Sequence, residues 1–172
     1  QSIALARQVG NQMTVTWSTF HLGLLAMEQG DYEESERLTR ESIAGFRALS
    51  HDPGVAWALQ TLSQIALLTG SPAEARLLAE QSLALFEVNG SPWGQSGAHC
   101  RLGQAYLAQD DIEQARFHLR LSVALAAGAK SVMMLTVHLA EVARLWAATG
   151  EPARAADLLA FVLQHPAIWF YT

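Results

Sequence analysis

The sequence repeats itself every 40 residues, and this period constrains the fold more than any other feature. Residues that tolerate a left-handed backbone recur at this interval, inside similar phrases: Gly30, Gly70, Asp110 and Gly150. In three of the phrases the next residue is a good helix N-cap, and a Glu or Gln follows three positions later. These capping boxes pair Asp31 with Glu34, Ser71 with Glu74 and Asp111 with Gln114. Each phrase therefore predicts the end of one helix and the immediate start of another.

Apolar residues keep the same register on both sides of these phrases. The aligned sets include Leu22, Leu62, Leu102 and Val142 before the turn, and Ile43, Leu83, Val123 and Leu163 after it. Their spacings of three, four and seven are typical of helices with one buried face. Small residues at a third set of positions would let the paired helices approach closely: Ser35, Ala75, Ala115 and Ala155. A second turn, rich in Gly and Pro, falls half a repeat away and is expected to be longer than the first.

We therefore predict an all-α fold, a right-handed α-solenoid of antiparallel helix pairs with about four repeats. Helix A, a turn, helix B and a second turn make up each repeat. We assign one array to residues 1–172: 1–10 as the end of a preceding helix B, 11–50, 51–90 and 91–130 as three repeats, and 131–172 as the fourth repeat with an apolar tail. We expect this array to be a fragment of a larger protein. Its incomplete first repeat and apolar tail are expected to promote self-association.

Two stretches carry a resemblance to a known family. Leu102-Gly103-x-x-Tyr106, followed by Asp110, resembles the tetratricopeptide signature, as does Leu22-Gly23-x-x-Ala26 followed by Gly30. The repeat here is longer than the usual length of about 34 residues. Long repeats rich in Ala, Leu and Arg, and the phrase Ser91-Pro-Trp-Gly, resemble the helical sensor arrays of bacterial signal-transducing (STAND) ATPases, which include the maltose-type transcription activators. This resemblance implies a cytoplasmic recognition module.

Composition and charge exclude several functions. Sixteen acidic against eleven basic residues give a net charge of −5, which argues against direct binding of nucleic acid. A single cysteine, Cys100, excludes an internal disulfide framework. The most apolar run, 121–140, contains Lys130 and His138 and joins two predicted helices, so we predict no membrane-spanning segment.

The candidate binding surface is the concave wall that A helices form in arrays of this kind. Large aromatic side chains supply contact area there, and amides and guanidinium groups can bind a peptide backbone or a polar ligand. The candidate residues are Trp17, Phe20, His21, Leu24, Trp57, Gln60, Gln64, Cys100, Arg101, Gln104, Glu141 and Arg144. For Trp17 and Trp57, packing between successive A helices is an equally open explanation. The ligand class stays open between a protein, a peptide and a small molecule.

Catalytic and metal-binding patterns do not emerge from the sequence. The acidic clusters stand at predicted helix starts, where negative charge favours the helix dipole. The six histidines lack the spacing of metal ligands, and His99 and His118 take positions that are apolar in other repeats. We therefore expect no enzyme activity, no cofactor and no metal. The predicted function is a non-catalytic recognition module, the sensor part of a bacterial signalling ATPase or transcription regulator. The alternative is a constitutive protein–protein scaffold without a switching role.

Overall fold

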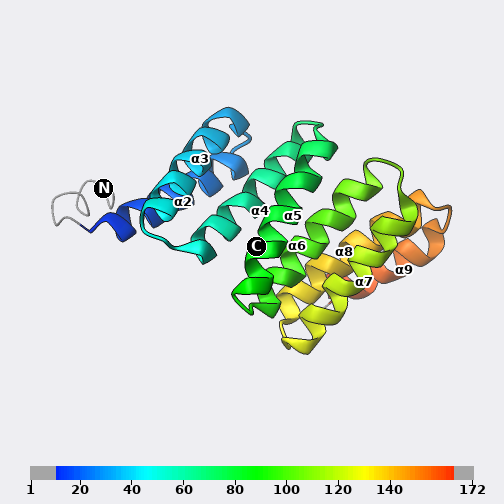
Figure 1. Ribbon diagram of the computed structural model, residues 1–172. Helices are drawn as coiled ribbons and strands as arrows, with labels where there is room; N and C mark the ends of the chain where they lie inside the picture. The colour runs from blue at the N-terminus through cyan, green and yellow to red at the C-terminus, as the bar shows by residue number, and fades with distance from the viewer. Residues whose placement is uncertain (1–10, 165–172) are drawn as a thin grey trace. The chain divides into compact units, whose positions relative to one another are not determined.

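The computed structural model describes residues 11–164, and the chain there is built from helices connected by short turns (Figure 1). The helices are α2 (Gln12–Glu28), α3 (Tyr32–Ala48), α4 (Asp52–Leu68), α5 (Pro72–Val88), α6 (Pro92–Leu107), α7 (Ile112–Gly128), α8 (Val132–Ala148) and α9 (Pro152–Gln164). No strand occurs within these residues. The prediction of an all-α repeat array is confirmed. The expected helix end at 1–10 and the apolar tail after Gln164 lie outside the described residues.

The turn inside each repeat follows the predicted geometry. Gly30 and Gly70 have φ of 80°, Gly150 has 84°, and Asp110 reaches 60° despite its side chain. The second turn was expected to be longer, and this expectation is wrong. Three residues join α3 to α4, just as three join α4 to α5. Ser50 and Lys130 take the left-handed conformation there, with φ of 51° and 54°. Both turns therefore use one left-handed residue followed by an N-cap, and the first turn uses glycine for it more often.

The helix caps follow the prediction in two of the three boxes. Asp31 accepts a hydrogen bond from the Glu34 amide, and Asp111 accepts one from the Gln114 amide, both at 3.1 Å. The prediction is wrong for Ser71, whose side chain makes no capping hydrogen bond. Its backbone has φ −113° and ψ 64°, and Glu74 reaches across to Arg40 of α3 at 3.5 Å instead. The start of α5 depends on Pro72, which sets φ at the first helical position.

The chain forms two compact units, Gln1–Asn89 and Gly90–Thr172, whose described parts are α2–α5 and α6–α9. In both units the helices of one repeat cross at the small residues that the register singled out. The Ser35 hydroxyl donates to the Gly23 carbonyl at 2.7 Å, and the Ser63 hydroxyl donates to the Ala75 carbonyl at 2.8 Å. A Cβ added to Gly103 would lie 2.6 Å from Cγ of Leu119, so only glycine fits that crossing.

Burial departs from the register at the first and the last described helix. In α9, Leu163 is 61% exposed although the aligned Ile43 of α3 is buried. Leu22 and Leu25 of α2 are 44% and 47% exposed, whereas their equivalents in α4, Leu62 and Ile65, are buried. The α4 residues face the preceding repeat, since α4 packs against α3. α2 has no preceding repeat among the described residues, which explains why this part of the predicted apolar stripe is uncovered.

The apolar run 121–140 is divided between two helices. It covers the end of α7 and the beginning of α8, with Lys130 in the turn between them. Within the described residues, no helix is long and apolar enough to cross a membrane.

Candidate recognition surfaces on the A helices

The candidate residues of the first unit lie on α2 and α4, which contact each other. The Trp17 ring packs edge-on against Phe46 of α3, with ring centroids 4.8 Å apart, and His21 stacks on it at 5.8 Å. The Trp57 ring packs edge-on against Phe86 of α5, also at 4.8 Å. Both tryptophans are half-buried. Each therefore packs on a core phenylalanine and still exposes part of its ring, so core packing and contact with a partner are compatible.

The other candidate residues of this unit differ in the exposure of their side chains. His21 is exposed, and Leu24, Gln60 and Gln64 are half-buried. Phe20 is only 5% exposed and lies beneath the Trp17 ring, with the two ring centroids 5.8 Å apart. Phe20 therefore supports the surface from below, and the accessible part of the α2–α4 face is aromatic and amide in character.

The candidates of the second unit form a polar cluster on α6 and α8. The Arg101 guanidinium donates to Oε1 of Gln104 at 2.8 Å, and Arg144 pairs with Glu141 at 2.8 Å. Burial lowers the pKa of Arg101, while the neighbouring Cys100 and Glu141 act in the opposite direction. The Glu141 carboxylate of α8 therefore favours the charged form of Arg101 on the neighbouring helix α6. Arg144 is exposed and Arg101 and Gln104 are half-buried, so this face carries two guanidinium groups, one carboxylate and one amide.

Cys100 lies beneath the polar cluster and is a packing residue. Its side chain is 3% exposed and belongs to a core cluster with Ala115, Leu119 and Leu145. Burial raises the pKa of the thiol to about 12, and the Glu141 carboxylate acts in the same direction against Arg101 and Arg144. The thiol therefore stays protonated at neutral pH, which leaves it a poor nucleophile.

Two contacts of histidine side chains were missed by the sequence analysis. Nδ1 of His99 lies 3.0 Å from Nδ1 of His118, which comes from the next helix. The only sequence signal was that both residues replace apolar positions of the register. Nδ1 of His138 lies 3.2 Å from the Ser96 hydroxyl, which donates to the Ser122 carbonyl. Ser96 is fully buried and cannot meet a substrate. The described residues contain no group of three or more side chains able to hold a metal ion.

Comparison with known protein families agrees with this architecture. Sequence profiles described as tetratricopeptide repeat match residues 12–87 and 96–128. The chain therefore contains tetratricopeptide repeats, as the Leu-Gly-x-x-Tyr pattern indicated. Helices α8 and α9 lie outside both matches. Repeats of this class are protein-interaction modules and are typically non-catalytic scaffolds. A comparison with curated protein sequences gives no match.

Solved structures share the fold at low sequence identity. BtubC (BKLC) from P. vanneervenii is 14% identical with a TM-score of 0.71, over 94% of this chain and 66% of that one. This chain thus spans just under two thirds of BtubC. A Podosopora anserina protein described as a kinesin light chain with nearly identical TPR-like repeats is 22% identical, with a TM-score of 0.66 over 84% of this chain and 72% of that one. The crystal structure of a point variant of that protein gives the same identity and TM-score.

Proposed function

We propose that the A-helix faces recognise an extended segment of a partner protein. The observation that carries this proposal is the placement of Trp17 and Trp57, which pack against Phe46 and Phe86 and remain half-exposed. Rigid aromatic rings of this kind are typical anchors of protein interfaces, because they supply contact area at a low entropy cost. Gln60 and Gln64 lie on the same helix as Trp57 and would bind the backbone of the partner segment.

The polar cluster of the second unit suggests a preference for acidic groups. Arg144 is exposed and can present its guanidinium to a carboxylate of the partner, beside the half-buried Arg101. Glu141 restrains Arg144 through their ion pair and would exclude a second basic group. The two faces are proposed as separate contact sites, the first apolar and the second selective for carboxylates.

This recognition would serve as the sensor part of a bacterial, cytoplasmic signal-transducing ATPase or transcription regulator. The support for this role is the 40-residue repeat length and the resemblance of the turn phrases to the sensor arrays of that class. A bound segment can switch such a parent only if it binds the resting and active states with different affinity. Reading the gene upstream of Gln1 tests the assignment. A phosphate-loop ATPase followed by further 40-residue repeats is expected, and a gene without one would remove the switching role.

Peptide selection on the whole chain tests recognition itself. We expect a displayed library of random 12-residue peptides to yield binders that carry an aromatic residue. A combined His21→Ala and Gln64→Ala variant should weaken the selected peptide at least tenfold, measured by fluorescence polarisation. The matched control is Gln81→Ala, an exposed glutamine of α5 outside both faces. Equal affinity of the test and control variants would contradict the proposal.

A constitutive scaffold is the second candidate, and the tight helix crossings favour it. A Cβ added to Gly23 would lie 2.9 Å from Oγ1 of Thr39, and one added to Gly103 would lie 2.6 Å from Cγ of Leu119, so the paired helices are in close contact at both positions. Hydrogen exchange with the selected peptide bound separates the two functions. Protection confined to α2 and α4, or to α6 and α8, indicates a rigid scaffold. Changes that spread to the B helices indicate a switch.

A further inference from the structure

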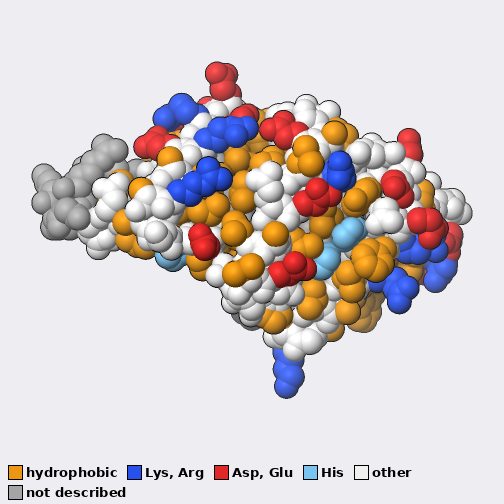
Figure 2. Space-filling model, viewed as in Figure 1, with side chains coloured by type: hydrophobic (Ala, Val, Ile, Leu, Met, Phe, Trp, Pro, Cys, Tyr) orange, Lys and Arg blue, Asp and Glu red, His pale blue; other side chains and the backbone are white. Residues whose placement is uncertain are grey.

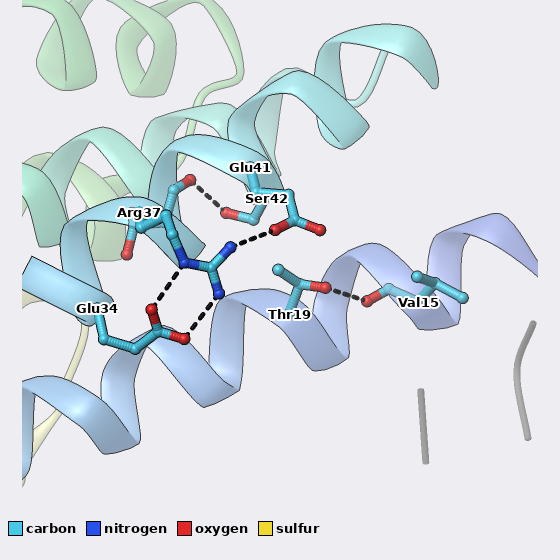
Figure 3. Close-up of polar contacts among 7 residues, drawn as sticks. Val15, Thr19, Glu34, Arg37, Glu41 and Ser42 are labelled. Atoms are coloured by element: carbon cyan, nitrogen blue, oxygen red, sulfur yellow. Dashed lines mark hydrogen bonds and ion pairs between the residues drawn. The ribbon is translucent and has the colours of Figure 1, made fainter. Parts of the chain in front are cut away.

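Ion pairs between acidic and basic side chains cover the surface that α3 and α5 form on the outer side of the first unit. On α3, Arg37 binds Glu34 at 2.7 Å and Glu41 at 3.2 Å (Figure 3). Arg40 binds Glu36 of its own helix at 2.8 Å and reaches Glu74 of α5 at 3.5 Å. Figure 2 shows blue and red side chains interleaved over α3. The space left beside Glu36, Arg40 and Glu74, where α3, α4 and α5 join, is only about 20 Å³.

The equivalent junction of the second unit carries a different set of charges. Two repeats on, Arg116 stands in place of Glu36, Arg120 in place of Arg40, and Arg154 in place of Glu74. Because Arg40 and Glu74 meet at 3.5 Å, the register brings positions 120 and 154 toward each other as well. Three arginines thus replace an alternating acid–base–acid set. Within residues 11–164, neither Arg116 nor Arg120 has an ion-pair partner.

Apolar side chains replace the remaining charges of that surface. Phe117 and Leu121 of α7 take the positions of Arg37 and Glu41. Here the junction opens into a cavity of about 530 Å³ between α7, α8 and α9, lined by Phe117, Leu121, Val142, Trp146 and Leu158, with Arg120 at its edge. The Arg154 guanidinium lies 4.5 Å from the centroid of the Trp146 ring and also pairs with Glu151. The cavity therefore combines apolar walls with Arg120 in its lining, and Arg154 lies against the Trp146 ring that forms part of its wall.

We propose that this cavity binds a small amphipathic carboxylate, with its apolar body between α7 and α8 and its carboxylate on Arg120 and Arg154. The volume falls within the range of small-molecule sites, about 300–1,000 Å³. Apolar walls with a few convergent polar groups are the usual composition of such sites. Guanidinium groups bind carboxylates through two parallel hydrogen bonds, and Arg120 has no acidic partner to compete with the ligand within the described part of the chain. Neither Arg101 nor Arg144 lines this cavity, so the proposal does not depend on the proposed function of the A-helix faces.

Calorimetry with three eight-carbon probes tests the proposal on the whole chain. Octanoate should bind, 1-octanol should bind at least tenfold more weakly, and octylammonium should not bind detectably. Arg120→Ala should weaken octanoate at least fivefold, because it removes the cation at the cavity edge. Ala124→Trp should abolish binding, because the exposed Ala124 lines the cavity and the indole would occupy it.

The matched controls come from the equivalent positions of the first unit. Arg40→Ala and Ala44→Trp should leave octanoate binding unchanged, since the space beside Arg40 is only about 20 Å³ and neither residue lines the separate hollow of about 350 Å³ that Arg47, Leu59 and Leu85 line. If Ala124→Trp fails to fold by circular dichroism, Arg120→Ala decides the result alone. Absence of octanoate binding, equal binding of octanol, or an unchanged Arg120→Ala variant would overturn the proposal. So would a tenfold gain in affinity on deleting residues 165–172, which would identify that apolar segment as the natural occupant of the cavity.

Discussion

His99 of α6 and His118 of the following helix α7 contact each other in the second unit. Their Nδ1 atoms are 3.0 Å apart, and the Tyr106 ring stacks on His118 with centroids 5.4 Å apart. One imidazole must donate and the other accept, so the pair is compatible with two neutral rings. Burial lowers the pKa of His99 to about 4, and the charge of His118 acts in the same direction. The contact therefore favours the uncharged form of His99.

This pair predicts that the protein loses stability in mild acid. The pKa of His99 lies at about 4 in the folded chain against an ordinary value of 6.5, so the unfolded chain binds more protons between these two values. The free energy of unfolding should therefore fall as the pH drops from 6.5 toward 4. Burial also lowers the pKa of His138, which contributes with the same sign. Urea unfolding at pH 7 and pH 5 measures the loss.

A double variant isolates the contribution of the pair. His99→Leu with His118→Leu introduces the residue that stands at the equivalent positions Leu59 and Leu78. The loss of stability between pH 7 and pH 5 should become smaller without vanishing, since His138 keeps its share. His21→Leu is the control, because His21 is exposed. A double variant with the same pH dependence as the parent chain would show that the pair does not control acid stability.

The N-caps of α5 and α7 differ in their side-chain hydrogen bonds, and this difference tests how much a capping bond stabilises a single helix. The Asp111 side chain accepts a hydrogen bond from the Gln114 amide, whereas Ser71 makes no such bond at the start of α5. Asp111→Ala should lower the free energy of unfolding by about 1 kcal/mol, and Ser71→Ala by clearly less. Thermal unfolding of the two variants checks this difference. Equal losses would mean that helix propensity, and not the side-chain bond, decides the effect.

The repeat period made the helices and the positions of both turns predictable from sequence. The short length of the second turn was not predictable, because Ser50 and Lys130 take the left-handed conformation that glycine takes in most of the other turns. The twelve candidate site residues could be assigned to A helices because the spacing of residues in the sequence is enough to define the helical register. Their exposure could not be assigned, since Phe20 and Cys100 are buried while Gln60, at the same register position, is half-buried. That difference depends on the neighbouring side chains of other helices.

The outer cavity was beyond sequence reasoning for a related reason. The register aligns Arg116, Arg120 and Arg154 with Glu36, Arg40 and Glu74, but the alignment matters only once two B helices are known to meet there. The Arg40–Glu74 contact joins residues 34 positions apart. Charges that far apart in sequence are usually scattered surface residues. The change in charge at these positions becomes informative only when the ion-paired junction of the first unit is compared with the open junction of the second.

Two compact units within one chain predict that damage to one unit stays local. In repeat proteins each repeat depends mainly on its neighbours, so stability is close to a sum of local terms. Gly103→Val places a side chain 2.6 Å from Cγ of Leu119 and should destabilise the second unit by roughly 2 kcal/mol. Hydrogen exchange followed by mass spectrometry should then show at least tenfold faster exchange in α6 and α7, and less than twofold change in α2 and α3. An equal increase in all helices would show instead that the chain unfolds as one cooperative unit.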